Sequence, residues 1–255
     1  MAKIIAVFSI KGGVGKSTSA VNLAYLAAQS GAKTLLWDMD HQGAAGFLLK
    51  VDSHLQGGLK SVMKDMEQPA AKRHLAEKIV HTSYENLDLL PSDISMRMLD
   101  VKAAESRSSN RFVEKFLQPV LEEYDYIVVD CPPGLTAANE SLLHAASLVL
   151  VPTIPTTLSV RMLEELRNYL KAHVDPAPRL RAFFSLVDSR KNLHKQLYEE
   201  LCVNRKTIIL PVAVPYSSAT EKMALFRAPL PVFAASVPAA LAYGELWESI
   251  RKMRL

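Results

Sequence analysis

A glycine-rich segment near the start of the chain has residue types suited to binding phosphate. Residues 9–18 read SIKGGVGKST. Glycines let backbone N–H groups approach an anion closely, and a lysine that opens the following helix can reach the β- and γ-phosphates of a nucleotide. Lys16 matches that lysine, and the Ser17 hydroxyl can bind Mg²⁺. The generic motif has glycine where this chain has Ile10, so the match rests on Gly12, Gly13, Val14, Gly15, Lys16, Ser17 and Thr18.

The flanking sequence has the pattern that such a loop requires. Residues 3–9 form a β-branched apolar run that is typical of a buried parallel strand. Residues 20–29 carry apolar side chains at helical spacing and stop near Ser30 and Gly31, a predicted glycine cap. Strand, loop and helix together would place the positive end of the helix dipole at the phosphates.

Two further apolar runs end in carboxylates. Residues 33–43 read KTLLWDMDHQG, and the alternation of a strand places Asp38 and Asp40 on one face. Residues 126–134 read YIVVDCPPG and end their apolar run at Asp130. A magnesium nucleotide needs oxygen ligands close to its phosphates. The order of the three segments therefore favours a nucleotide site over solvated strand ends.

The three segments resemble the deviant Walker A box, the second box and the Walker B box of the ParA/MinD (Soj) family of ATPases. The mark of that family is Lys11, which the resemblance implies reaches across a dimer interface to the partner's nucleotide. The resemblance assigns Asp40 to the attacking water and the magnesium shell, Asp38 to support of the loop, and Asp130 to the metal. His41 stands where the family usually has proline, which bears on the rigidity of this first switch.

The resemblance also implies ligands beyond the phosphate loop. It predicts ATP and Mg²⁺ as cofactors, with Ser17, Asp40 and Asp130 at the metal and Lys11 at the nucleotide. Leu186, Val214 and Pro215 are expected near the adenine, although these positions also suit simple packing.

The rest of the chain alternates strands with helices. Residues 147–152, 181–188 and 207–215 are predicted strands, and residues 160–171 and 193–201 predicted helices. This pattern predicts an α/β fold with a doubly wound, mostly parallel sheet, helices on both faces and the ligand at the carboxyl ends of the strands. We expect one P-loop ATPase domain over residues 1–255, with residues 52–84 as helices and loops inserted after the second strand.

Composition excludes several other classes. Two isolated cysteines, Cys131 and Cys202, fit neither a zinc site nor a disulfide framework, and they argue against the cluster-bridged nitrogenase iron protein. Three prolines interrupt the apolar residues 228–243, so we do not expect a membrane span there. We expect a cytoplasmic chain.

The net charge of +4 is modest, but its distribution is uneven. The residues predicted to contact DNA are Arg190, Lys191, Lys195, Arg205 and Lys206. A basic face would bind phosphate backbones without reading sequence. The alternative that these residues are only the solvated sides of helices stays equally open.

Family members act on nonspecific DNA or on membranes, the latter through a carboxyl-terminal amphipathic helix. Here Leu246, Trp247 and Ile250 are expected to pack that helix onto the body, which favours DNA. We therefore expect a weak, partner-stimulated ATPase that forms a homodimer with ATP, associates with the nucleoid and works with a ParB-like or cargo adaptor protein. The alternatives are a MinD-like membrane ATPase and a small-molecule enzyme on the same scaffold.

Overall fold

The computed structural model describes residues 1–51, 75–92, 96–203 and 207–255. The strands are β1 (Lys3–Val7), β2 (Thr34–Asp38), β3 (Val80–His81), β4 (Leu87–Leu90), β5 (Tyr126–Asp130), β6 (Leu148–Thr153), β7 (Arg179–Val187) and β8 (Ile209–Pro215). The helices are α1 (Lys16–Gln29), α2 (Ala44–Leu48), α5 (Met96–Glu105), α6 (Phe112–Leu117), α7 (Ala137–Ala145), α8 (Thr157–His173), α9 (Asn192–Val203), α10 (Ser218–Glu221), α11 (Met223–Phe226), α12 (Leu230–Ala234) and α13 (Pro238–Arg251).

The strands form one sheet of order β3-β4-β2-β5-β1-β6-β7-β8. Every pairing is parallel except that of β3 with β4. Successive residues of β1 point to opposite faces, so Ile4 packs into one core cluster and Ile5 into the other. The predicted α/β fold with a mostly parallel sheet is confirmed.

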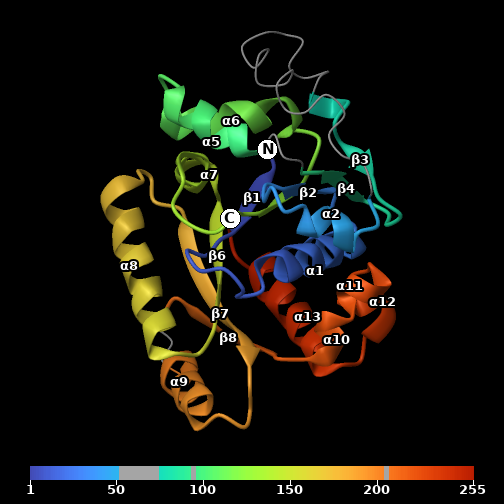
Figure 1. Cartoon of the computed structure of the whole chain (residues 1–255), viewed down its shortest axis with the longest axis vertical. Helices are drawn as coiled ribbons and strands as arrows, with labels where there is room; N and C mark the ends of the chain where they lie inside the picture. The colour runs from blue at the N-terminus through green and yellow to red at the C-terminus, as the bar shows by residue number, and fades with distance from the viewer. Residues whose placement is uncertain (52–74, 93–95, 204–206) are drawn as a thin grey trace.

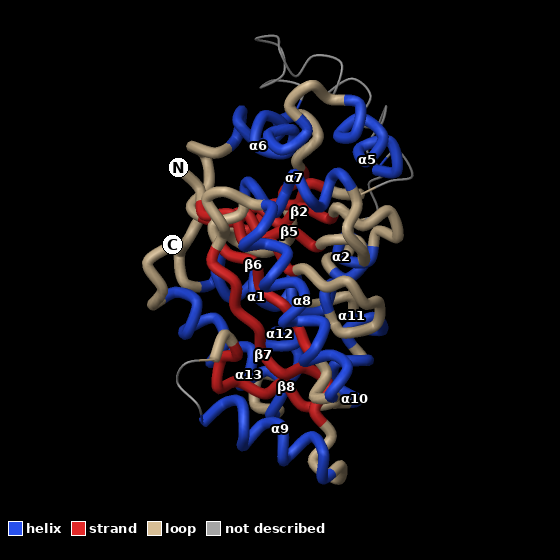
Figure 2. Tube along the Cα trace, turned by 90° about the vertical axis from the view of Figure 1, so that its left-hand side faces the viewer, coloured by secondary structure: helices blue, strands red, loops and turns tan. Residues whose placement is uncertain are grey.

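Helices cover both faces of the sheet (Figures 1 and 2). One core cluster joins the sheet to α5, α6, α7 and α8, and the other joins it to α1, α2, α11, α12 and α13. Leu246, Trp247 and Ile250 of α13 are buried in the second cluster, as expected from the sequence. Gly31 adopts φ 89° just after α1, which confirms the predicted glycine cap. Within the described part of the chain, no helix has the length and apolar character needed to cross a membrane.

The predicted strands are found, but the sheet has two more. The interpretation of residues 52–84 as helices and loops is wrong at Val80–His81, which form β3, and residues 52–74 lie outside the described residues. Leu87–Leu90, for which the sequence analysis made no strand prediction, form β4. Two- and four-residue strands are too short to show a period in the sequence.

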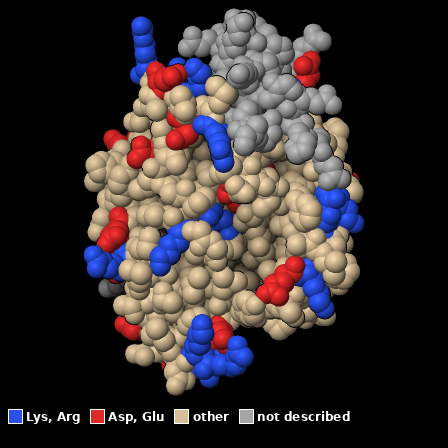
Figure 3. Space-filling model, in the orientation of Figure 1, with Lys and Arg blue, Asp and Glu red and all other residues tan. Residues whose placement is uncertain are grey.

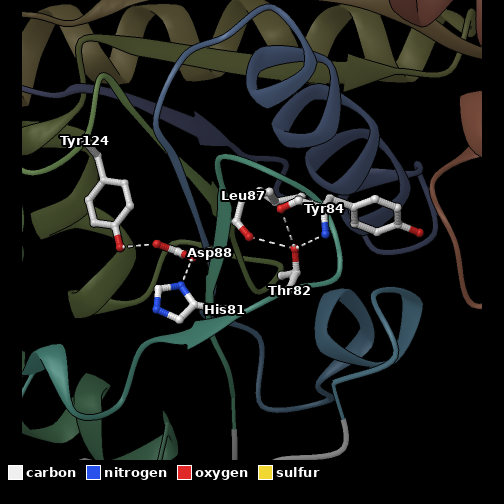
Figure 4. Close-up of polar contacts among 6 residues, drawn as sticks. All are labelled: His81, Thr82, Tyr84, Leu87, Asp88 and Tyr124. Carbon is white, nitrogen blue, oxygen red and sulfur yellow. Dashed lines mark hydrogen bonds and ion pairs between the residues drawn. The ribbon is translucent and has the colours of Figure 1, made fainter.

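Polar side-chain contacts stabilise the edge of the sheet formed by β3 and β4. Asp88 on β4 accepts a hydrogen bond of 2.8 Å from the Tyr124 hydroxyl and lies 2.6 Å from Nδ1 of His81 on β3 (Figure 4). Thr82 donates to the Leu87 carbonyl across the same hairpin. The edge is therefore fixed by cross-strand polar pairs rather than by strand length.

Candidate functional site

The three predicted segments meet at the carboxyl ends of adjacent central strands. In the strand register, Asp130 at the end of β5 lies opposite Val7 at the end of β1 and opposite Asp38 at the end of β2. The glycine loop leaves β1 directly beside these two carboxylates. The expected convergence of the motifs at this end of the sheet is confirmed.

The loop has the backbone shape of an anion cradle. Gly13 and Gly15 have φ values of 70° and 89°, a region that glycine enters without steric cost. No side chain caps α1, whose N-cap is Gly15, so the N–H groups of its first turn remain available to an anion. The carbonyl of Val14 accepts a 2.7 Å hydrogen bond from the Ser185 hydroxyl of β7, which anchors the loop to the sheet.

The two lysines of the loop have different surroundings. Lys16 is only 7% exposed, and its ammonium lies 3.4 Å from the carbonyl of Lys11. Lys11 is half-buried, and its N–H donates to the Ser9 hydroxyl. The described residues provide no hydrogen-bond or ion-pair partner for the Lys11 ammonium. Lys16 is thus directed into its own loop, whereas the charge of Lys11 is left unpaired within this subunit.

The carboxylates of Asp38 and Asp130 are completely buried. Asp38 accepts from the N–H of Gly46 at 3.0 Å through one oxygen. Its other oxygen and both oxygens of Asp130 have no hydrogen-bond partner among the described residues. Burying an ionised carboxylate without a partner is costly, so these oxygens fit a cation that the protein alone does not supply.

The electrostatics agree with that interpretation. Burial is the main cause that raises the pKa of Asp38 to about 7, and the charge of Asp40 adds to it. Burial, followed by the charge of Asp38, raises the pKa of Asp130 well above its usual range. The Ser17 hydroxyl and the Lys16 ammonium act in the opposite direction, although no hydrogen bond of ordinary geometry joins Ser17 to Asp130. A divalent cation here would favour the ionised carboxylates.

The described residues contain no group of three or more His, Cys, Asp or Glu side chains that could hold a metal by themselves. Mg²⁺ usually takes one or two carboxylates and completes its shell with substrate phosphates and water. Asp130 and the Ser17 hydroxyl therefore suit a metal that arrives with a nucleotide.

Asp40 lies in the turn after β2 and is held by its neighbours. Its Oδ1 accepts a 3.0 Å hydrogen bond from the N–H of Gln42 and lies 3.5 Å from Nδ1 of His41. The other ring nitrogen of His41 lies 2.8 Å from the Gln42 side-chain nitrogen. These contacts thus hold the turn after β2 at the position where a proline ring would otherwise restrict the backbone.

The segment after β5 is held by Asn139, which the sequence analysis missed. Its completely buried side chain donates to the carbonyls of Pro132 at 3.0 Å and Gly134 at 2.7 Å. Thr136 caps α7 by accepting from the N–H of Asn139. An asparagine three residues inside a helix carries no local sign that it closes the preceding loop.

The residues expected near the adenine lie at the ends of β7 and β8. Val214 is buried, Pro215 is half-buried, and Leu186 is half-buried with φ 52°. A surface hollow there is lined by Pro215, Asp188 and Tyr216 together with residues of α13, whereas Leu186 and Val214 do not line it. Pro215 is the one of the three residues that borders an open space at this site among the described residues.

Of the predicted DNA contacts, Arg205 and Lys206 lie outside the described residues. Lys191 precedes α9, and Lys195 is exposed one turn later. Arg190 is exposed, but its guanidinium forms two 2.9 Å contacts with Asp188, which hold the pKa of that carboxyl well below its usual range. Figure 3 shows Lys and Arg side chains at this end of the molecule with acidic side chains among them. The positive charge is therefore partly neutralised.

The chain resembles known proteins over most of its length. A family model described as an AAA domain matches its residues 2–179. The chain is 29% identical over 234 residues to the chromosome partitioning protein ParA of Myxococcus xanthus, covering 89% of this chain and 80% of that protein. It is 30% identical over 205 residues to the sporulation initiation inhibitor protein Soj of Bacillus subtilis, covering 79% of each.

Solved structures support the fold. The ATP complex of Cyanothece McdA matches with a TM-score of 0.82 at 22% identity, covering 100% of this chain and 98% of that chain. Cobyrinic acid a,c-diamide synthase from Mycobacterium smegmatis, bound to ADP and magnesium, matches with a TM-score of 0.74 at 22% identity, covering 98% and 94%. At these identities the likeness shows the shared fold alone.

Proposed function

The chain belongs to the ParA/MinD (Soj) family of P-loop ATPases, and on that premise we propose that it is a positioning ATPase that dimerises with ATP and binds DNA without sequence preference. The observation that carries the nucleotide chemistry is the pair of buried carboxylates, Asp38 and Asp130, which have three oxygens without a hydrogen-bond partner among the described residues. They fit a magnesium nucleotide, because the burial of ionised carboxylate oxygens without a cation or a hydrogen-bond donor is unfavourable in free energy.

Each residue of the site has a role in this proposal. The N–H groups of Gly12 to Gly15 and the Lys16 ammonium bind the phosphates of ATP, and Pro215, which lines the hollow at the ends of β7 and β8, borders the adenine. Asp130, Ser17 and Asp40 hold Mg²⁺, which neutralises charge on the phosphates when bound. Asp40 orients the water that attacks the γ-phosphate.

Lys11 makes the dimer dependent on the nucleotide. Its ammonium has no partner among the described residues of its own subunit, so it is available to a second copy. In the proposed dimer it lies against the partner's triphosphate, and the loss of the γ-phosphate weakens the pair. The whole chain, residues 1–255, acts as one ATPase domain.

Dimerisation also explains DNA retention. Two copies of a weakly basic surface that includes Lys191 and Lys195 bind DNA far better than one, because the second set of contacts is intramolecular. An adaptor protein of the ParB type would stimulate a slow ATPase and release the subunits, which would position a cargo over the nucleoid in the cytoplasm. A MinD-like membrane role is disfavoured because the apolar face of α13 is buried.

The deciding experiment measures DNA retention by the purified chain with ATP, with ADP and without nucleotide, together with its mass by light scattering. We expect DNA binding and a dimeric mass in the presence of ATP, and neither of them with ADP or without nucleotide. The Lys16→Ala variant should show neither property under any of the three conditions. ATP hydrolysis that needs a small-molecule substrate, with no DNA binding in any nucleotide state, would instead assign the chain to the scaffold's small-molecule enzymes.

A further inference from the structure

Exposed apolar side chains gather over three short helices that lie side by side in Figures 1 and 2. Phe47 of α2 is 48% exposed, Leu225 and Phe226 of α11 are 76% and 46% exposed, and Val232 of α12 is 46% exposed. We name these four residues the α2/α11/α12 surface. Large exposed apolar side chains that occur together, rather than singly, mark interaction sites.

Contacts make this surface continuous. The Arg227 guanidinium lies 4.8 Å from the centre of the Phe47 ring and donates a 2.9 Å hydrogen bond to the Phe47 carbonyl, joining the segment after α11 to α2. The ring centres of Phe226 and Phe233 lie 4.6 Å apart with the rings tilted by 38°, which joins α11 to α12. The three helices therefore present one apolar area rather than separate side chains.

Both sides of the surface are tied to the nucleotide site. The N–H of Gly46 in α2 donates to the buried Asp38 carboxylate at 3.0 Å. On the other side, the buried Asn22 of α1 accepts from the N–H of Leu230 at 2.8 Å and donates to the sulfur of Met223 at 3.4 Å. A partner that bridges α2 and α11 would thus hold the segment after β2 against the helix that follows the phosphate loop.

The rim of the surface is cationic. Arg227 lies over Phe47. Lys50, which follows α2, and Lys222, which precedes α11, are both exposed. The neighbouring carboxylate, Glu221, accepts a hydrogen bond from the Tyr216 hydroxyl. Figure 3 shows a largely uncharged area at the lower right of this face, with Lys or Arg and Asp or Glu side chains next to each other beside it. Lys50, Lys222 and Arg227 outnumber Glu221 around this surface, so charge complementarity favours an occupant with acidic flanks.

We propose that the α2/α11/α12 surface docks an acidic amphipathic helix of a partner protein. An apolar stripe at i, i+3, i+4 and i+7 matches a surface built from side chains of neighbouring helices, and flanking carboxylates meet Lys50, Lys222 and Arg227. The docked helix contacts α2 and α11 together, so the partner acts on the nucleotide site through Asp38 and Asn22. The docking surface goes beyond the proposed function and stands whether or not the chain binds DNA.

The test uses a fluorescein-labelled helical peptide of about 16 residues, about 24 Å long, with leucine at i, i+3, i+4 and i+7 and with glutamate and alanine elsewhere. Its binding to the full chain is measured by fluorescence anisotropy at low salt. Leu225→Ser with Phe226→Ser should weaken binding about tenfold or more. Lys222→Glu, which leaves the apolar side chains in place, should also weaken it.

The matched control is Val101→Ser with Leu193→Ser, which removes apolar side chains of 52% and 44% exposure from α5 and α9 and should leave binding intact. Equal binding by the Leu225/Phe226 variant and this control would overturn the proposal. A peptide in which lysine replaces every glutamate should bind more weakly. Tighter binding of that peptide would contradict the proposal that the docked helix is acidic. If the chain bound anionic phosphatidylserine vesicles through Leu225 in preference to the peptide, the proposal would be overturned and the surface assigned to a membrane. If the Leu225/Phe226 variant lost self-association while the parent chain did not bind the peptide, the surface would instead be assigned to a second copy of the chain.

Discussion

At the scale of single residues, the two lysines of the glycine loop are expected to have different roles, Lys16 in nucleotide binding and Lys11 in dimerisation. Lys16→Ala removes the ammonium directed into the loop, and we expect ATP affinity to fall by about 100-fold because charge-assisted contacts to phosphate are lost. Lys11→Ala should retain ATP in calorimetry yet stay monomeric in light scattering. An ATP-dependent dimer of the Lys11→Ala chain would refute the role of Lys11 in the partner's site.

Asp40 is the residue expected to orient the attacking water. Asp40→Ala should bind ATP and hold the dimer, while hydrolysis falls by about 100-fold or more, the usual contribution of a positioned acid or base. Phosphate release under single-turnover conditions measures this. His41→Pro, which restores the residue usual in the family, serves as the control and should retain hydrolysis. A hydrolysis rate in Asp40→Ala equal to the parent's would remove Asp40 from the mechanism.

Asp38 makes the stability of the nucleotide-free chain depend on pH. Its pKa rises from 3.8 to about 7 on folding, so between these values the folded chain binds more protons than the unfolded one. The stability from this group is fully present below about pH 4 and is lost as pH rises toward 7, by up to about 1.4 kcal/mol per pH unit.

We therefore expect Asp38→Asn to become more stable relative to the parent as pH is raised from 4.5 to 7.5 in urea unfolding. Ser185→Ala, which removes the buried hydroxyl that anchors the glycine loop but no titrating group, should show no such trend. If the free energies of unfolding of Asp38→Asn and the parent changed in parallel with pH, the raised pKa of Asp38 would be contradicted.

At the scale of elements, α7 holds the segment after β5 through one side chain. Asn139→Ala would leave the carbonyls of Pro132 and Gly134 without their donors, and we expect a loss of about 1–3 kcal/mol in the free energy of unfolding. Hydrogen exchange of residues 131–136 should accelerate as well. Asn192→Ala, at the exposed start of α9, is the matched control. Unchanged exchange would show that α7 does not restrain this segment.

At the scale of the whole molecule, the predicted DNA contacts follow β7, whereas the glycine loop and the buried carboxylates lie at the ends of β1, β2 and β5. Reversal of Arg190, Lys191 and Lys195 to glutamate should weaken DNA retention and reduce the slope of log affinity against log salt by about 2, because Arg190 is already neutralised by Asp188. Reversal of Lys102, Arg107 and Arg111, exposed around α5, should leave the slope in place. The opposite result would move the DNA surface to α5.

The sequence by itself determined the nucleotide loop, the strands that end at Asp38 and Asp130, and the α/β class. These features depend on local patterns: glycines for positive φ, apolar runs for buried parallel strands, and carboxylates at their ends. The long strands and helices repeat a period often enough to be recognised, whereas β3 and β4 do not.

Only the tertiary structure decided which side chains these motifs depend on. Asn139, Ser185 and Gly46 reach the site through hydrogen bonds to loop or carboxylate atoms, and no spacing in the sequence encodes such contacts. The α2/α11/α12 surface likewise joins residues about 180 positions apart, whose proximity results from the packing of helices on one face of the sheet. Local pattern fixes the elements, and burial of their apolar faces decides which of them meet.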